Sequence, residues 1–317
     1  MIGFRNAVVS SAHPLASSLA VSVLKKGGNA IDAAVAVSLM LGVAEPAFSG
    51  LGGGGFALVH LASGESVAID YRETAPFASL SSMFEVLPDG EVRDNLNSIG
   101  PLAIATPGAL AGLCHLLDAY GTMKFNDISE KVIALAKSGI PIGRLVVKIL
   151  RENRYFALDK LRKYEASSRA FLKDGEIPRA QEKLRVPDLA RMLREISTER
   201  RDSFYPGGIA KLIVNHVQNI GGIIASEDLA RYAVKLRKPV AGTYRGFTIV
   251  SMPPPSAGGA LLLEALNILE NFDYEAYRSD WLHLIADSIR LALTDKATHF
   301  ADPDFVEIPL LSLVGKQ

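Results

Sequence analysis

The stretch EPAFSGLGGGGFALVHLASGESVAIDYRETAP, residues 45–76, decides how this chain folds. It contains four consecutive glycines: Gly52, Gly53, Gly54 and Gly55. Glycine has no Cβ, so this backbone can take positive φ angles and can be approached closely by another segment or a ligand. A glycine run also costs conformational entropy on folding, which indicates that its geometry is needed. We expect close backbone packing beside a functional site, with a purely structural turn as the alternative.

Two short runs of β-forming residues follow the glycines, at 56–60 and 66–71, and a turn at Ser63 and Gly64 separates them. This pattern predicts a β-hairpin. The second run ends by presenting Arg72. An arginine held at a strand end suits a carboxylate, which it can bind through two parallel hydrogen bonds. The alternative is that Arg72 forms an ion pair with Glu73 or another acid.

These residues resemble the γ-glutamyltransferase (gamma-glutamyltranspeptidase) family, which belongs to the N-terminal nucleophile hydrolases. The resemblance begins with SGLGGGGF at 49–56 and YRETAP at 71–76. Further motifs occur in the order typical of the family: SSAHPLAS (10–17), KKGGNAIDAAVA (25–36), ATPGALAG (105–112), GTYRGF (242–247), MPPPSAGG (252–259) and DPDFV (302–306). Matches along almost the whole chain are far more specific than any single motif. They correspond to the large subunit of such an enzyme.

The resemblance implies an α+β fold, the four-layer αββα arrangement of N-terminal nucleophile hydrolases. Residues 1–317 would be the large-subunit portion of one domain, with antiparallel strands and outer helices. A small subunit, released from the same precursor by self-cleavage, would complete that domain as a heterodimer. We expect no catalytic residue in this chain, since the family's nucleophile is the threonine that starts the small subunit.

The implied reaction is acyl transfer or hydrolysis through a γ-glutamyl-threonine ester, with glutathione as the typical donor. The α-amino group of the threonine would serve as its base. Arg72 is expected to bind the α-carboxylate of the donor, and Glu73 to support it. Either Gly53 or Gly54 is expected to have a positive φ or to lie against the catalytic strand. No metal, organic cofactor, nucleic acid or membrane is expected to take part.

Two alternatives stay open at this point. A relative with the same fold could act on another amide, such as a cephalosporin-type side chain or poly-γ-glutamate. A non-catalytic binding protein could keep the pocket without the nucleophile. The motif at 71–76 favours a donor with a free α-carboxylate.

The bulk composition excludes several other functions. The 317 residues contain 34 Lys and Arg and 34 Asp and Glu, so nothing indicates a nucleic acid or an anionic membrane as a partner. The longest apolar stretch, 30–43, is shorter than the ~20 residues that span a bilayer. No basic segment followed by an apolar run opens the sequence. We therefore expect a cytoplasmic protein, or an extracytoplasmic one if a signal segment has been removed.

Other residues with chemical potential are expected to be structural. Cys114, the single cysteine, lies in an apolar helical run and predicts a buried thiol. Asp302 and Asp304 flank a proline, where a turn is favoured over an acid–base or metal-binding pair. His216 falls on an apolar helix face and predicts a core histidine. Ser256 is expected to start a helix rather than to act as a nucleophile. The glycine run does not match a phosphate-binding motif.

Hydrophobic periodicity and capping residues predict most of the remaining elements. Residues 7–11 are predicted to form a strand, 234–252 several strands, and 79–100 a surface loop. Residues 144–180 are charged and predict an outer, solvated helical layer. Longer helices are predicted at 14–26, 30–41, 107–120, 128–137, 187–198 and 280–300.

Overall fold

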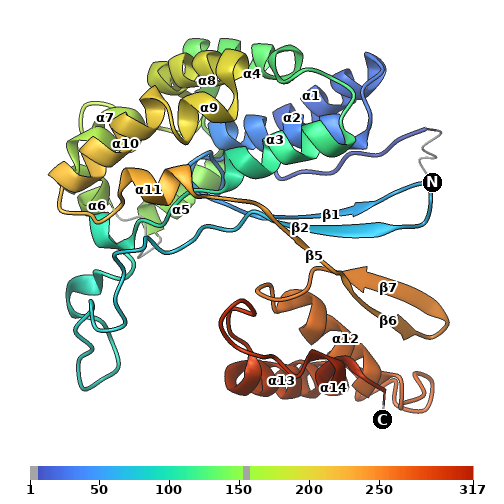
Figure 1. Ribbon diagram of the computed structural model, residues 1–317. Coiled ribbons are helices and arrows are strands. Elements are labelled where there is room, and N and C mark those ends of the chain that lie inside the picture. Colours follow the sequence, from blue (N-terminus) through green and yellow to red (C-terminus); the bar gives the residue numbers. More distant parts are fainter. Residues whose placement is uncertain (1–5, 153–157, 317) are drawn as a thin grey trace. The chain divides into compact units, whose positions relative to one another are not determined.

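The computed structural model describes residues 6–152 and 158–316. The chain divides into two compact units (Figure 1). The first contains the residues up to Gly55 together with Tyr71–Ala233, and the second contains Phe56–Asp70 together with the residues from Val234 onward. The assignment of the whole chain to one domain completed by a second subunit stays a prediction.

The first unit is mainly helical. Its longer helices are α1 (Pro14–Lys25), α2 (Ala30–Ala44), α3 (Ala109–Tyr120), α4 (Phe125–Ser138), α8 (Pro187–Glu199) and α10 (Gly208–Asn219). Shorter elements are η1 (Arg93–Asn95), η2 (Pro101–Ala103), β3 (Ile140–Pro141), α5 (Arg144–Glu152), α6 (Leu158–Lys163), α7 (Glu165–Phe171), β4 (Lys183–Leu184), α9 (Arg201–Phe204) and α11 (Ser226–Ala230).

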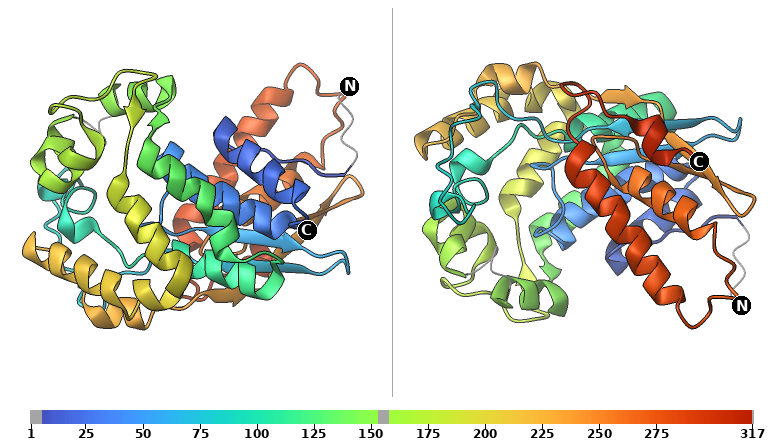
Figure 2. Two further views of the ribbon diagram at one scale, coloured as in Figure 1. Left: turned by 90° about the horizontal axis from the view of Figure 1, so that it is seen from above. Right: turned by 90° about the horizontal axis from the view of Figure 1, so that it is seen from below.

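Helix α2 forms the centre of this unit, as its all-round apolar sequence predicts. It packs against α1, α3 and α4, and α4 packs in turn against α8 (Figures 1 and 2). Val35, Ala36 and Met40 are completely buried. Because burial of apolar surface is the main favourable term in folding, this helix contributes strongly to the stability of the unit.

Asp32 fixes the start of α2 to a distant turn. Its carboxylate accepts hydrogen bonds from the backbone of Asn29, which caps the helix, and from Thr122 and Met123 beyond the end of α3. Burial acts to raise the pKa of Asp32, but the hydrogen bonds from Thr122, Asn29 and Met123 outweigh it and lower that pKa. The capping role predicted from sequence is confirmed, and the carboxylate also holds the α3–α4 connection.

The second unit combines antiparallel strands with helices. Strands β1 (Phe56–His60), β2 (Ser66–Asp70) and β5 (Lys235–Arg237) form one antiparallel sheet in the order β1-β2-β5, and β6 (Val240–Tyr244) pairs with β7 (Phe247–Ser251). Helix α12 (Gly258–Leu269) packs on α13 (Trp281–His299), on α14 (Leu310–Val314) and on the β6–β7 hairpin. The predicted hairpin is confirmed, and helices beside antiparallel strands confirm the α+β class.

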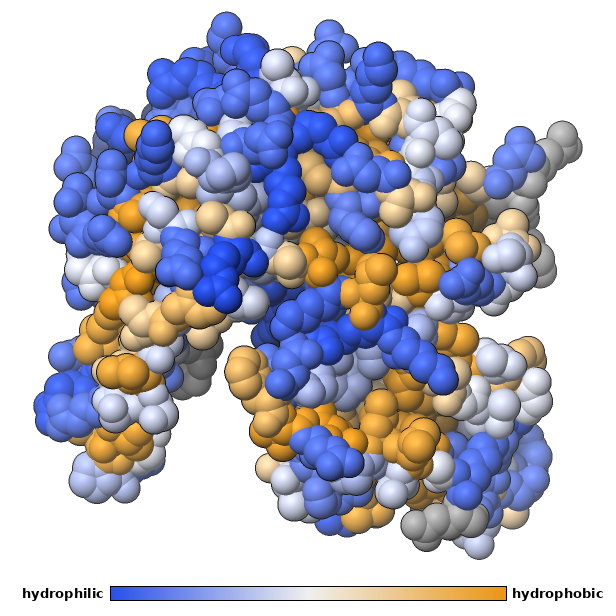
Figure 3. Space-filling model, viewed as in Figure 1, coloured by the Kyte–Doolittle hydropathy of each residue, from blue (hydrophilic) through white to orange (hydrophobic). Residues whose placement is uncertain are grey.

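Several large apolar side chains of the second unit lie at the surface. Phe247, Leu282 and Leu311 are 74%, 78% and 87% exposed. Figure 3 shows hydrophobic surface over the helices of this unit. No helix in the described part of the chain is both long enough and apolar enough to cross a membrane.

Four sequence predictions are wrong in detail. Residues 7–11 form no strand, because no described segment pairs with their backbone. Helix α4 begins at Phe125 rather than at 128, which places Asp127 in the first turn, where the helix dipole favours a carboxylate. His216 is exposed rather than in the core, because the buried face of α10 runs through Val214 and Val217 instead.

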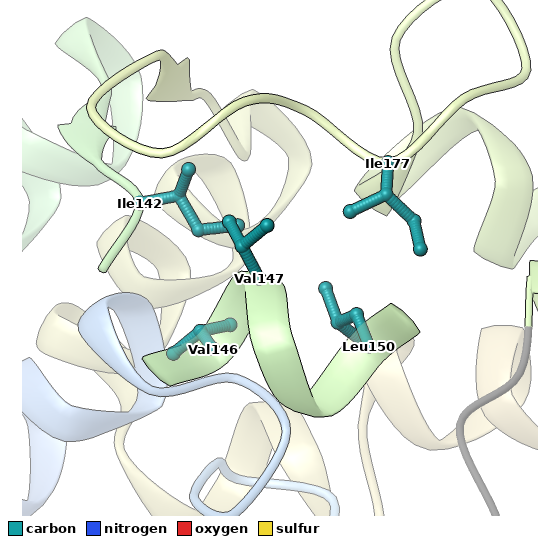
Figure 4. Close-up of a cluster of buried hydrophobic side chains, with 5 residues drawn as sticks. All are labelled: Ile142, Val146, Val147, Leu150 and Ile177. Carbon is teal, nitrogen blue, oxygen red and sulfur yellow. The ribbon is translucent and has the colours of Figure 1, made fainter. Parts of the chain in front are cut away.

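The fourth correction concerns the prediction for residues 144–180, of which 153–157 lie outside the described residues; the described part is more than a solvated layer. Val146, Val147 and Leu150 of α5 form a buried cluster with Ile142 and Ile177 (Figure 4). Although this region is rich in charged residues, α5 also carries apolar residues at helical spacing, and these form its buried face.

Candidate functional site

The segment after β2 carries Tyr71, Arg72, Glu73 and Thr74, and the glycine loop holds its first residue. Gly55 and Tyr71 exchange two backbone hydrogen bonds, from Gly55 N to Tyr71 O at 3.2 Å and from Tyr71 N to Gly55 O at 3.0 Å. The backbone immediately before Arg72 is therefore held by hydrogen bonds to the glycine loop.

Gly54 explains why the loop needs glycine. A Cβ on Gly54 would lie 2.6 Å from both the Glu73 nitrogen and the Tyr71 oxygen, and 2.8 Å from Glu73 Oε2. No real Cβ tolerates such contacts, so an alanine here would push the loop away from residues 71–73. The expected close packing of the glycine loop is confirmed, and its place beside the catalytic strand stays a prediction. The alternative expectation of a positive φ at Gly53 or Gly54 is wrong, because the loop requires space and not a left-handed backbone.

The start of α3 holds the opposite side of the segment. Thr74 and Thr106 exchange two backbone hydrogen bonds, of 3.2 and 2.8 Å. The backbone N–H groups of Gly108 and Ala109 both donate to the Gly53 oxygen at 2.9 Å. The helix start thus binds the glycine loop, and the loop binds Tyr71, so the three segments form one hydrogen-bonded frame.

Two glycines of the 105–112 motif make room for Tyr71. A Cβ on Gly108 would lie 2.2 Å from the Tyr71 carbonyl oxygen and 2.0 Å from the Tyr232 hydroxyl. A Cβ on Gly112 would lie 2.2 Å from the Tyr71 ring. Both glycines are therefore required by the packing of residue 71, which the sequence motif alone did not reveal.

Tyr232, a residue outside every motif found in the sequence, holds the backbone of Arg72. Its hydroxyl donates a 2.8 Å hydrogen bond to the Arg72 carbonyl oxygen. Its ring stacks on Tyr205 at 5.7 Å, and the Arg201 guanidinium lies 4.9 Å from the centre of the Tyr205 ring. Arg201 also donates to the Tyr232 carbonyl oxygen. No motif or spacing marks Tyr232, because its role depends on tertiary packing.

Tyr205 anchors this support in the core. Its hydroxyl donates to the Pro107 oxygen at 3.0 Å and accepts from the Ala111 nitrogen at 3.1 Å, so it binds the start of α3. Burial raises the pKa of Tyr205 well above its ordinary value, and the phenol stays neutral.

The side chains of Arg72 and Glu73 are exposed, although their backbone is fixed. The Glu73 carboxylate lies over the glycine loop, since its oxygens approach the Cβ positions of Gly53 and Gly54 to 3.4 and 2.8 Å. The frame therefore presents both side chains at the surface of the first unit. The substrate-binding roles expected for Arg72 and Glu73 stay predictions.

A cavity of about 510 Å³ adjoins this frame. The glycine loop from Gly50 to Gly54, Tyr71 and Glu73 line one part of it, and apolar side chains such as Leu113 and Met192 line another. Arg72 does not line the cavity. A molecule bound in the cavity would therefore contact Glu73 and the backbone of the glycine loop rather than Arg72. The volume suits a small organic molecule.

The two aspartates of the 302–306 motif have structural contacts in the second unit. Asp302 accepts from the Asp304 nitrogen at 3.0 Å, which confirms the predicted turn. Arg237 donates to both oxygens of Asp304, at 3.1 and 2.9 Å, and to Asp70 at 2.7 Å, while Lys235 also pairs with Asp304. The bonds from Arg237 and Lys235 lower the pKa of Asp304 to about 2. These ion pairs fasten the turn to β2 and β5.

The remaining candidates are placed as follows. Cys114 is buried, and burial raises the pKa of its thiol, which confirms the structural assignment. Ser256 lies in the turn before α12. Within residues 6–152 and 158–316, no three His, Cys, Asp or Glu side chains form a group that could hold a metal ion.

Comparison with known proteins adds independent information. Residues 16–317 match the family model described as gamma-glutamyltranspeptidase. The chain is 38% identical over 316 residues to the glutathione hydrolase proenzyme of Escherichia coli (strain K12), a match that covers 98% of this chain and 54% of that protein. It is 36% identical over 322 residues to the Acylase ACY 1 proenzyme of Pseudomonas sp. (strain SE83), covering 99% of this chain and 57% of that protein.

A solved structure matches the fold along the whole chain. The crystal structure of Helicobacter pylori gamma-glutamyltranspeptidase superimposes with a TM-score of 0.94 at 40% identity, and the match covers 100% of this chain and 90% of that one. The chain thus spans about half the length of the curated relatives and almost the whole length of the solved chain.

Proposed function

The chain belongs to the gamma-glutamyltranspeptidase family, and from this premise we propose that it is the large-subunit portion of an enzyme that transfers or hydrolyses γ-glutamyl groups. Its fold is that of the N-terminal nucleophile hydrolases, as the sequence motifs imply. The activity, the substrate and the partner of the complete protein are proposals.

The frame around residues 71–74 is the observation that carries this proposal. Three segments far apart in the sequence hold the backbone of Arg72: the glycine loop, the start of α3 and Tyr232. A side chain on a backbone fixed in this way loses less entropy when it binds a ligand. Arg72 is therefore well placed to bind the α-carboxylate of a donor through two parallel hydrogen bonds. Glu73, beside it, would contact the donor from the cavity side.

The length comparison supports a second chain. The E. coli and Pseudomonas relatives are named proenzymes, and this chain covers 54% and 57% of them. The chain of the solved H. pylori protein is instead covered to 90%. A precursor cut into two chains, one of which corresponds to this sequence, accounts for the partial coverage of the proenzymes and for the nearly complete coverage of the solved chain. In our proposal the second chain begins with the nucleophilic threonine, whose own amino group removes the proton from its hydroxyl.

An acylase acting on another amide is the second candidate. The identity to Acylase ACY 1 is 36% over 99% of this chain, close to the 38% found for the glutathione hydrolase. Two acyl groups that differ only in the α-amino group can distinguish the two candidates. A γ-glutamyl group carries an α-amino group and an α-carboxylate, and a glutaryl group keeps the carboxylate but lacks the amine.

A substrate panel on the complete protein tests the proposal. The gene for the full precursor is expressed, and the N-terminus of each chain in the purified product is sequenced. A threonine at the start of a second chain, with faster hydrolysis of γ-glutamyl anilide than of glutaryl anilide, supports the γ-glutamyl enzyme. Faster hydrolysis of glutaryl anilide supports the acylase. Binding without turnover of either compound would support a non-catalytic relative.

A further inference from the structure

A second, smaller cavity lies in the first unit, and the described residues that line it are apolar. Its volume is about 140 Å³. Helix α5 contributes Val146 and Leu150, and the neighbouring elements contribute Ile142, Leu161, Phe171 and Leu184. Every lining residue in the described part of the chain is apolar, and these residues offer water no side-chain hydrogen-bond partner.

The walls of this cavity are held in place by the buried cluster on α5. Ile142, Val146 and Leu150 are 4%, 1% and 8% exposed and pack with Val147 and Ile177 (Figure 4). Leu161 packs against the same cluster. Side chains in such a cluster occupy fixed rotamers, so the cavity has a defined shape and does not collapse freely.

The small cavity adjoins the large cavity beside the glycine loop. Pro46 and Ala47, in the turn after α2, line both cavities, and so does Phe171 at the end of α7. These three residues stand between the two cavities, and a molecule bound against the loop and Glu73 would reach the apolar space by passing them.

We propose that the small cavity is a binding subsite for one aromatic ring or branched alkyl group of the substrate. This inference rests on the proposed function, because it takes a γ-glutamyl amide as the molecule whose other part contacts Glu73 and the glycine loop in the large cavity. An enclosed apolar cavity of about 150 Å³ binds benzene, so this partly open space of about 140 Å³ has room for one ring. A charged group would lose its hydration without gaining a side-chain partner among the described lining residues, so the subsite favours an apolar group.

The substrate class follows from this arrangement. Preferred substrates carry an apolar group at the end remote from the acyl carbon, joined by an arm long enough to cross the large cavity. Burial of a phenyl group improves kcat/KM on the order of 10- to 100-fold over a substrate without it.

Direct binding of an apolar probe tests the subsite without relying on enzyme activity. Fluorobenzene is titrated into the complete protein and followed by ¹⁹F NMR. Wild type is expected to show a saturable shift, which is lost in Leu184→Trp and in Leu161→Trp, because either indole fills the cavity. Leu212→Trp is the matched control, since Leu212 is exposed on α10. Melting curves identify any variant that does not fold. If one of the two cavity variants does not fold, the other is sufficient for the test.

Kinetics then connect the subsite to the substrate. A series of γ-glutamyl amides of ω-phenylalkylamines is compared with γ-glutamyl methylamide. The ratio of their kcat/KM values is expected to rise at one arm length in wild type and in Leu212→Trp, and to approach 1 in Leu184→Trp.

The outcomes separate the two proposals. If no γ-glutamyl amide is cleaved, the proposed function fails and the fluorobenzene titration decides on the subsite. If the amides are cleaved but fluorobenzene does not bind saturably, or binds equally to both cavity variants, the subsite is disproved.

Discussion

The hydroxyl of Tyr232 donates a 2.8 Å hydrogen bond to the carbonyl oxygen of Arg72. The two residues are 160 positions apart in the sequence, and the bond holds the backbone of the proposed donor-binding arginine. A hydrogen bond of this kind contributes about 1 kcal/mol to stability. It also holds the backbone atoms from which the Arg72 side chain projects.

Tyr232→Phe tests this support. The ring and its stacking on Tyr205 are kept, and only the bond to the Arg72 oxygen is removed. We expect the free energy of unfolding to fall by about 1 kcal/mol. The KM for a γ-glutamyl anilide should rise several-fold with a smaller change in kcat. Tyr274→Phe is the control, because Tyr274 packs on Trp281 in the second unit. Equal KM values in the two variants would mean that Tyr232 does not position Arg72.

The four loop glycines are expected to differ in their tolerance of alanine. A Cβ on Gly52 meets nothing within 4 Å, whereas one on Gly54 meets two backbone atoms at 2.6 Å. Gly54→Ala should therefore destabilise the protein by about 1–3 kcal/mol and impair maturation, while Gly52→Ala is mild. Thermal melting and the extent of precursor cleavage measure both effects. A harmless Gly54→Ala would show that the loop moves aside easily.

Glu264 on α12 predicts a stability that depends on pH. Burial, together with the neighbouring Asp295 on α13, raises its pKa to about 7. The unfolded chain has an ordinary glutamate pKa near 4.5, so the folded state binds more protons between about pH 4.5 and 7. Stability should fall as pH rises through this window, by on the order of 1–3 kcal/mol.

Glu264→Gln removes this titration. Urea unfolding midpoints between pH 5 and 8 should decline in wild type and stay flatter in the variant. The control is Glu275→Gln, since the Glu275 side chain is 76% exposed. A wild-type profile identical to that of Glu264→Gln would show that Glu264 is ionised throughout.

The exposed apolar surface of the second unit predicts dependence on a second chain. Phe247, Leu282 and Leu311 are largely exposed, and in the described residues the β6–β7 pair has no third strand. Such surfaces and strand edges favour association. Residues 1–317 expressed alone should be poorly soluble or melt without cooperativity, whereas the complete precursor should melt cooperatively. A soluble monomeric fragment with a cooperative transition would contradict this expectation.

Most elements could be predicted from the sequence because their signals are local, whereas the fold was implied by the resemblance of the motifs to a known family. Asn29 and Asp32 mark a helix start, and alternating apolar residues mark the β1–β2 hairpin. The glycine motifs predicted close packing but not its partners, since Gly108 and Gly112 are needed only where Tyr71 folds against them.

Contacts across long sequence distances were not predictable in this way. Tyr232, Tyr205 and Arg237 belong to no motif, and each acts through partners more than 60 residues away. Residues 7–11 have strand-forming composition, but a strand also requires a neighbour, which no composition reveals. The cytoplasmic location stays a prediction.

The role of Arg72 is the central claim, and kcat/KM of the complete enzyme with Arg72 variants tests it most directly. Lysine keeps the charge but loses the planar fork, so both Arg72→Lys and Arg72→Ala should bind the donor carboxylate poorly. Loss of a charge-assisted pair costs about 2–5 kcal/mol, or tens to thousands of fold in kcat/KM. Arg93→Ala is the control, since Arg93 pairs with Glu85 on an exposed loop.

The measurement compares γ-glutamyl anilide with 4-aminobutyryl anilide, which lacks the α-carboxylate. The account predicts a large loss on the first substrate, little change on the second, which wild type already cleaves slowly, and normal self-cleavage of the precursor. Equal kcat/KM of wild type and Arg72→Ala on γ-glutamyl anilide would contradict it and leave Arg72 as a partner in a structural ion pair.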